Sequence, residues 1–185
     1  MAIGTRLAAS VIQMEASAAA ILTPFMRLLL QRVLSASVSA EHHIIGQIGR
    51  GYLLLLCAME GDTEVQAQWL AEKVTRLRLF DGTDGKINDR SLIEIGGEVL
   101  IVSQFTLAGA TEKGNRPDYT GAAKPDVAEK LYDFFIEHMR KLGVVRVETG
   151  KFGAEMQVEL INDGPVTLLL ERSRNPKIQD PRTKN

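Results

Sequence analysis

The chain is poor in the residues on which disulfides, metal sites and common hydrolases depend. Its 185 residues include one cysteine, Cys57, so an internal disulfide is impossible. No Gly-x-Ser-x-Gly elbow, His-Glu-x-x-His pair or Cys-x-x-Cys pair occurs. The longest apolar run, Tyr52 to Met59, is far shorter than the roughly 20 residues that a membrane-spanning helix needs. That run instead predicts a buried strand, in which the Cys57 thiol is expected to be inert.

Histidine, a frequent general base, occurs three times and in no catalytic arrangement. His42 and His43 fall at the tip of a predicted hairpin, and His138 lies within the apolar face of a predicted helix. None of them belongs to a visible Ser-His-Asp or Cys-His pattern. We therefore interpret His138 as a half-buried packing residue and not as a base.

What the sequence does contain is typical of one soluble globular domain. It is 45% hydrophobic and 24% charged, and at this length folding buries roughly 70% of the extended chain's surface. The net charge of −1 is unevenly spread, because residues 26–171 carry −5 and residues 172–185 carry +4. An acidic core argues against a protein that coats nucleic acid, although the basic tail leaves room for a brief contact.

The composition divides the chain into three segments. Residues 1–25 are rich in alanine and serine, which predicts either a disordered extension or sequence upstream of a working start at Met26. Residues 26–171 hold the predicted strands and helices. Residues 172–185 are interrupted by two prolines and are predicted to form a flexible basic tail.

The hydrophobic periodicity predicts an α+β domain with two main helices. We expect a compact antiparallel, barrel-like sheet with both helices packed on it. The predicted helices span residues 65–80 and 125–142. The predicted strands are the hairpin 27–48 with its polar tip, then 52–59, 98–106, 144–148, 156–161 and 166–171.

One large aromatic side chain lies on the unexpected face of the first helix. The apolar stripe of this helix consists of Ala67, Leu70, Ala71, Val74 and Leu77. Trp69 falls on the opposite side. We expect Trp69 to be either exposed to solvent or covered by a second subunit.

Two segments carry polar or special residues where packing alone does not require them. Ser103-Gln104-Phe105-Thr106-Leu107 places polar side chains at the end of a buried strand, where they either cap the strand or meet a ligand. Asn162-Asp163-Gly164-Pro165 joins two predicted strands. By composition alone, this second segment is a tight hairpin turn.

Together these two segments resemble the signature motifs of the D-aminoacyl-tRNA deacylase (D-tyrosyl-tRNA deacylase) family. The motif residues are Ser-Gln-Phe-Thr-Leu at 103–107 and Gly-Pro-Val-Thr at 164–167. Three further landmarks occur in order, namely Gln31-Arg32-Val33, Gly114-Asn115-Arg116-Pro117 and the run from Phe152 to Val158. The resemblance extends from Met26 to about Glu171.

The resemblance implies a cytoplasmic homodimer that proofreads aminoacyl-tRNA, without a cofactor or a resident metal. It implies hydrolysis of the ester that joins a D-amino acid, or glycine mischarged on tRNA-Ala, to the tRNA 3′ end. The implied catalytic residues are Ser103, Gln104, Phe105 and Thr106. The implied chirality filter is a cis Gly164–Pro165 pair with Val166 and Thr167, projecting into the pocket of the other subunit. Arg32, Met156 and Asn162 are expected to support the pocket, and Lys113, Arg116 and the basic tail to meet tRNA phosphates.

The scarcity of bases fits the mechanism that the family is thought to use. The 2′-hydroxyl of the substrate can assist the attack of water, while backbone amides around Gln104, Phe105 and Thr106 form an oxyanion hole. Thr106 as a covalent nucleophile is the alternative mechanism. Two alternative functions stay open: a non-catalytic module that binds the tRNA 3′ end, and a variant that accepts L-alanine through a trans Gly-Pro bond.

Overall fold

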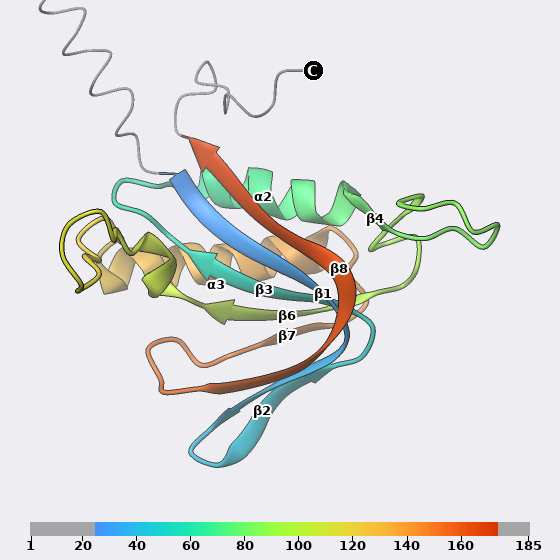
Figure 1. Cartoon of the computed structure of the whole chain (residues 1–185), viewed down its shortest axis with the longest axis horizontal. Coiled ribbons are helices and arrows are strands. Elements are labelled where there is room, and N and C mark those ends of the chain that lie inside the picture. The colour runs from blue at the N-terminus through green and yellow to red at the C-terminus, as the bar shows by residue number, and fades with distance from the viewer. Residues whose placement is uncertain (1–24, 174–185) are drawn as a thin grey trace, which may run out of the picture.

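The computed structural model describes residues 25–173, which form one curved sheet and two helices (Figure 1). The predicted extension, except Phe25, and the basic tail, except Arg172 and Ser173, lie outside these residues. The strands are β1 (Phe25–Ala40), β2 (His43–Ile48), β3 (Gly51–Cys57), β4 (Arg78–Phe80), β5 (Arg90–Ser91), β6 (Glu98–Ser103), β7 (Val147–Thr149) and β8 (Gln157–Ser173). The helices are α2 (Glu64–Arg76), α3 (Pro125–Lys141) and the short 3₁₀ helix η1 (Phe105–Ala108).

The long first strand organises the sheet. β1 pairs antiparallel with β2, β3 and β8, and the sheet continues from β3 through β6 to β7. Figure 1 shows β1 and β8 curving together from beside α2 down to the β2 hairpin. This curvature gives the expected barrel-like shape, so the predicted fold class is confirmed.

The sheet is mixed and not purely antiparallel, which corrects the prediction. β3 pairs parallel with β6, and β6 pairs parallel with β7. The connection from β3 to β6 contains α2, and the connection from β6 to β7 contains α3. Parallel neighbours require such crossovers, so both helices follow directly from this strand order.

The two helices pack against each other and against one face of the sheet, as their apolar stripes predict. α2 begins with a capping box formed by Thr63 and Gln66, and α3 begins with Pro125 in its first turn. The main core joins Met26, Leu28 and Leu30 of β1 to the inner faces of both helices. Among residues 25–173, no helix is long and apolar enough to cross a membrane.

Several predicted boundaries move because tertiary contacts decide them. α2 ends at Arg76, since residues 78–80 form β4, which pairs with β5 and places the Phe80 ring 5.1 Å from the Tyr52 ring. Trp69 is half-buried by its own subunit, with the Arg172 guanidinium 4.7 Å from its ring centroid.

The segment 156–171 is one strand and not two strands joined by a hairpin turn. β8 runs beside β1 over its whole length, but the register slips so that residues 163–166 lie opposite Arg32 alone. We call residues 163–166 the bulge. The bulge lets the chain pass Gly164–Pro165 without leaving the sheet.

Candidate active site

The first signature segment lies where β6 ends. The Gln104 amide donates to the Leu56 carbonyl at 2.8 Å, so it closes the ladder with β3 and is used by the fold. Phe105 and Thr106 open η1, and the first amides of a helix have no acceptor inside it. The Gln104 side-chain amide donates to the Thr106 hydroxyl. The strand end therefore presents two backbone donors and two coupled polar side chains.

A cavity of about 510 Å³ opens beside this strand end. We call it the β6 pocket. Its walls are the ends of β3 and β6, the first turns of α3 and the segment Phe152–Met156. Ser103, Gln104, Phe105 and Met156, four of the site residues that the resemblance implies, line it.

The β6 pocket contains no side chain that could act as a base near neutral pH. Among its lining residues, only Cys57 and Tyr132 can titrate. Burial raises the pKa of Cys57 to about 11, and burial also raises the pKa of Tyr132 well above its ordinary value. Both groups are neutral at physiological pH. The thiol is thus protonated, as expected for an inert cysteine.

Tyr132 is a structural member of this pocket that the sequence analysis missed. Its hydroxyl donates to the Ile101 carbonyl at 2.7 Å, and the Gly150 amide donates to the same carbonyl at 2.9 Å. Its ring lies 6.0 Å from that of Phe152. Tyr132 thereby joins β6 to the start of the Phe152–Met156 wall. A tyrosine within a helical apolar pattern signals only packing, so no motif could have revealed it.

The second signature segment is held by a buried guanidinium, that of Arg32. Arg32 is 7% exposed, and it donates to the carbonyls of Asp163 at 3.0 Å, Gly164 at 3.3 Å and Leu79. Its Nε also lies 3.3 Å from the Asp163 carboxylate. The peptide bond between Gly164 and Pro165 is cis, and both residues are exposed. The rigid donor fork of arginine suits such a set of oxygen acceptors.

Gln31 braces the same bulge from the other side of β1. Its side-chain amide donates to the Val166 carbonyl at 3.3 Å and to the Asn162 side chain, and its oxygen accepts from the Thr167 hydroxyl at 2.6 Å. Gln31 was not among the predicted site residues. Its place in the Gln31-Arg32-Val33 landmark was the signal that could have identified it.

The structure brings the predicted residues together in two groups and not in one site. Ser103, Gln104, Phe105 and Met156 share the β6 pocket, with Thr106 directly behind on η1. Arg32, Asn162 and the 164–167 segment gather at the middle of β8, and none of them lines that pocket. In Figure 1 the bend of β8 lies far from the end of β6.

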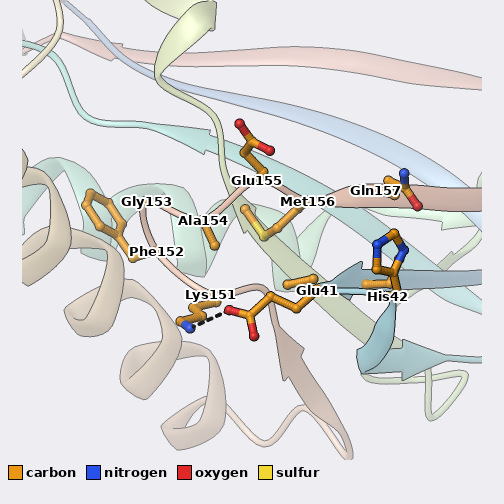
Figure 2. Close-up of a pocket in the computed structure, with 11 residues that line it drawn as sticks. Glu41, His42, Lys151, Phe152, Gly153, Ala154, Glu155, Met156 and Gln157 are labelled. Atoms are coloured by element: carbon orange, nitrogen blue, oxygen red, sulfur yellow. Dashed lines mark ion pairs between the residues drawn. The ribbon is translucent and has the colours of Figure 1, made fainter.

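A second cavity, of about 730 Å³, lies at the tip of the β1–β2 hairpin (Figure 2). We call it the tip cavity. Ser39–His42 and Lys151–Gln157 line it, and Lys151 faces Glu41 across it at 3.5 Å. Residues 152–154 and Met156 border both cavities. Within the described part of the chain, no three histidine, cysteine or acidic side chains gather as a metal site would require.

Comparisons with known proteins identify the family of the chain. A family profile described as "D-Tyr-tRNA(Tyr) deacylase" matches residues 29–171. A D-aminoacyl-tRNA deacylase of Exiguobacterium sp. is 54% identical over 148 residues, covering 80% of this chain and 99% of that protein. A D-aminoacyl-tRNA deacylase of Picosynechococcus sp. is 50% identical over 151 residues, covering 82% of this chain and 99% of that protein.

Two solved structures share the fold. One, titled "c-Myc DNA Unwinding Element Binding Protein", has a TM-score of 0.75 and 41% identity, over 79% of this chain and 98% of that one. The other, a probable eukaryotic D-amino acid tRNA deacylase, has a TM-score of 0.71 and 20% identity, over 80% of this chain and 99% of that one. By fold, the chain is thus of the deacylase type. The chain belongs to the D-aminoacyl-tRNA deacylase family and is a hydrolase acting on ester bonds.

Proposed function

We propose that the chain is a trans-acting editing hydrolase for tRNA charged with a D-amino acid or with glycine. It cleaves the ester at the tRNA 3′ end and releases the free amino acid and tRNA. The observation that carries this proposal is the β6 pocket, which Ser103, Gln104 and Phe105 line and which contains no group that titrates near neutral pH. Such a site suits a substrate that contains an activated ester and supplies the assisting hydroxyl itself.

The proposed chemistry is attack of water on the ester carbonyl carbon. The 2′-hydroxyl of the terminal ribose assists this attack, and the amides of Phe105 and Thr106 stabilise the negative charge on the carbonyl oxygen. The ester C–O bond then breaks, and the ribose 3′-oxygen leaves with a proton as a hydroxyl. Ser103 and Thr106 orient the terminal adenosine and the ester. Thr106 is not the nucleophile in this proposal, because the β6 pocket in front of it contains no base that could activate its hydroxyl.

We assign discrimination between D and L substrates to Gly164–Pro165 of a second copy of the chain. Gly164 and Pro165 are exposed and do not line the β6 pocket of their own subunit. Exposed apolar side chains support a homodimer along this surface: Leu34, Leu160, Ile161 and Leu169 are 42–58% exposed on β1 and β8. Backbone carbonyls of the inserted bulge would clash with an L side chain and pass a D side chain or glycine. Val166 and Thr167 extend the same surface.

The proposed partners are aminoacyl-tRNA and a second subunit, and the proposed compartment is the cytoplasm. The support for the substrate is family membership, since the curated relatives are D-aminoacyl-tRNA deacylases. The cytoplasm is where charged tRNA serves translation. Editing there would remove mischarged tRNA before the ribosome uses it.

The test is release of amino acid from D-Tyr-tRNA, L-Tyr-tRNA and Gly-tRNA by the full-length chain. We expect rapid release of D-tyrosine and glycine and at least a 100-fold slower release of L-tyrosine. Equal release of D- and L-tyrosine would overturn the filter. Binding of all three tRNAs without release of amino acid would instead establish the non-catalytic module.

A further inference from the structure

Two large aromatic side chains remain exposed at the mouth of the β6 pocket. The rings of Phe105 and Tyr119 meet edge to face, with centroids 5.3 Å apart and an interplanar angle of 68°. Phe105 is 61% exposed and Tyr119 is 37% exposed. By contrast, the stacked pair Tyr52 and Phe80 is fully buried. We call Phe105 and Tyr119 the aromatic platform.

The backbone fixes the position of the platform. Ala110 and Asp118 exchange two hydrogen bonds, at 2.8 and 2.9 Å, which close the loop between them just before Tyr119. Gly109 completes this support, because a Cβ atom there would lie 2.9 Å from Cε1 of the Tyr119 ring. The ring can therefore lie directly against the chain that leaves η1. A rigid, preformed surface loses little entropy on binding.

The platform continues the surface of the β6 pocket outwards. Phe105 lines the pocket and forms half of the platform. Ala122 and Ala123, which follow Tyr119 in the chain, also line the pocket. A ligand that fills the pocket and extends beyond it on this side would meet the two rings next.

Basic residues that could meet phosphates lie close to the platform in the chain. Lys113 and Arg116 lie in the loop that the Ala110–Asp118 bridge closes, and Lys124 directly precedes α3. Glu112, Asp118 and Asp126 of the first turn of α3 balance their charge, so the local net charge is zero. The Asp118 carboxylate accepts from the Thr120 amide at 2.9 Å, which lowers its pKa and ties it to the turn.

We propose that the aromatic platform binds the unpaired nucleotides that precede the terminal adenosine of tRNA, by stacking their bases. This inference rests on the proposed function, in which the pocket holds that adenosine. Exposed aromatic rings flanked by lysine and arginine are the common means of holding single-stranded nucleic acid, because every base offers a face for stacking. Tyr119 is thus a binding residue outside the two signature motifs.

The test measures, by fluorescence anisotropy, the binding of a fluorescein-labelled oligoribonucleotide ACCA without an attached amino acid to the full-length chain. Adenosine 5′-monophosphate serves as a competing mononucleotide, which can occupy the adenosine site but cannot reach the platform. We expect Tyr119→Leu to weaken binding of ACCA about tenfold, which corresponds to about 1.4 kcal/mol. Tyr119→Phe keeps the ring and should stay within twofold of the wild type. The matched control is Ile87→Ser, since Ile87 is 75% exposed in the loop after β4, at the opposite end of the molecule in Figure 1.

Four results would overturn the proposal. The first is no measurable binding of ACCA by the wild type, and the second is an unchanged affinity in Tyr119→Leu. The third is a Tyr119→Leu variant that loses equal affinity for ACCA and for the mononucleotide. The fourth is a Tyr119→Leu variant in which only the oligomeric state changes, as measured by sedimentation. The last result would assign the rings to a subunit contact. The amino acid release assay separates the two proposals, because a chain that binds ACCA through Tyr119 but releases no amino acid refutes only the deacylase function.

Discussion

The two signature regions of this chain are opposite in shape. The Ser103–Thr106 region lies at a strand end and lines a cavity built from β3, β6, α3 and the segment 152–156. The Gly164–Pro165 bulge is an exposed projection, anchored from beneath by Arg32. After their places in the proposed function, we call the first region the receiving half and the second the projecting half. In the proposed function these regions are the two halves of one site, which two copies of the chain complete together.

The largest expected effect comes from removing the anchor of the projecting half. Arg32→Leu leaves the Asp163 carboxylate and the carbonyls of Gly164 and Leu79 without their donor. We expect a loss of about 3 kcal/mol or more in the free energy of unfolding, measured in urea, and a fall of about 100-fold in kcat/KM for D-Tyr-tRNA because the bulge is misplaced.

Two further variants separate the anchoring role of Arg32 from general packing. Arg50→Met removes another guanidinium, which lies 5.3 Å from the Phe80 ring centroid, and should leave kcat/KM within twofold. Arg32→Lys keeps the charge but loses the donor fork, so it should fold and still lose activity. Wild-type activity in Arg32→Lys would refute the anchoring role.

The next effect concerns the receiving half and distinguishes the two mechanisms there. D-Tyr-tRNA with a 2′-deoxy terminal adenosine should be hydrolysed at least about 100-fold more slowly, because the assisting hydroxyl is gone. Thr106→Ala should lose no more than about tenfold with the normal substrate. The matched control is Thr83→Ala, at an exposed threonine in the loop after β4. Complete loss of activity in Thr106→Ala, with binding of tRNA intact, would favour the threonine nucleophile.

The strand end and the helices around the β6 pocket could be predicted from the sequence because their patterns are local. The change from apolar residues to Ser103 and Gln104 predicts both the end of the strand and its polar edge. The apolar stripe around Leu70 and the proline at position 125 predict the two helices. The wall formed by Phe152 and Met156 needed the family resemblance. No local pattern states which loop covers a given strand end.

The projecting half was harder to predict because distant residues define it. Gly164-Pro165 predicts a hairpin turn by composition, but the chain continues beside β1 since Arg32, more than 130 positions earlier, supplies the hydrogen bonds that the ladder loses. The parallel pairing of β3 with β6 was missed for a related reason. Whether two strands pair parallel or antiparallel depends on the connection between them, here a crossover helix, and cannot be predicted from the residues of the strands themselves.

A smaller effect is expected from removing the hydroxyl of Tyr132 beside the β6 pocket, and the buried Tyr52 provides the comparison. Tyr132→Phe removes the hydroxyl that donates to Ile101, and should cost about 1 kcal/mol of stability. Tyr52→Phe removes a buried hydroxyl that has no hydrogen-bond partner within residues 25–173, and should be neutral or slightly stabilising. Thermal unfolding measures both. Because Tyr132 also positions the pocket wall, only its variant should lower kcat/KM, and equal behaviour of the two variants would contradict that role.

The smallest effect tests whether a cavity alone makes a site. The tip cavity is comparable in size to the β6 pocket, but its walls carry Glu41 and Lys151, which are mostly exposed and form an ion pair at 3.5 Å. Exposed pairs of this kind contribute little, so a double-mutant cycle of Glu41→Gln and Lys151→Met should give a coupling below about 0.5 kcal/mol. Glu41→Gln should leave kcat/KM for D-Tyr-tRNA within twofold. A tenfold loss would show that substrate crosses the shared wall at Met156 and uses both cavities.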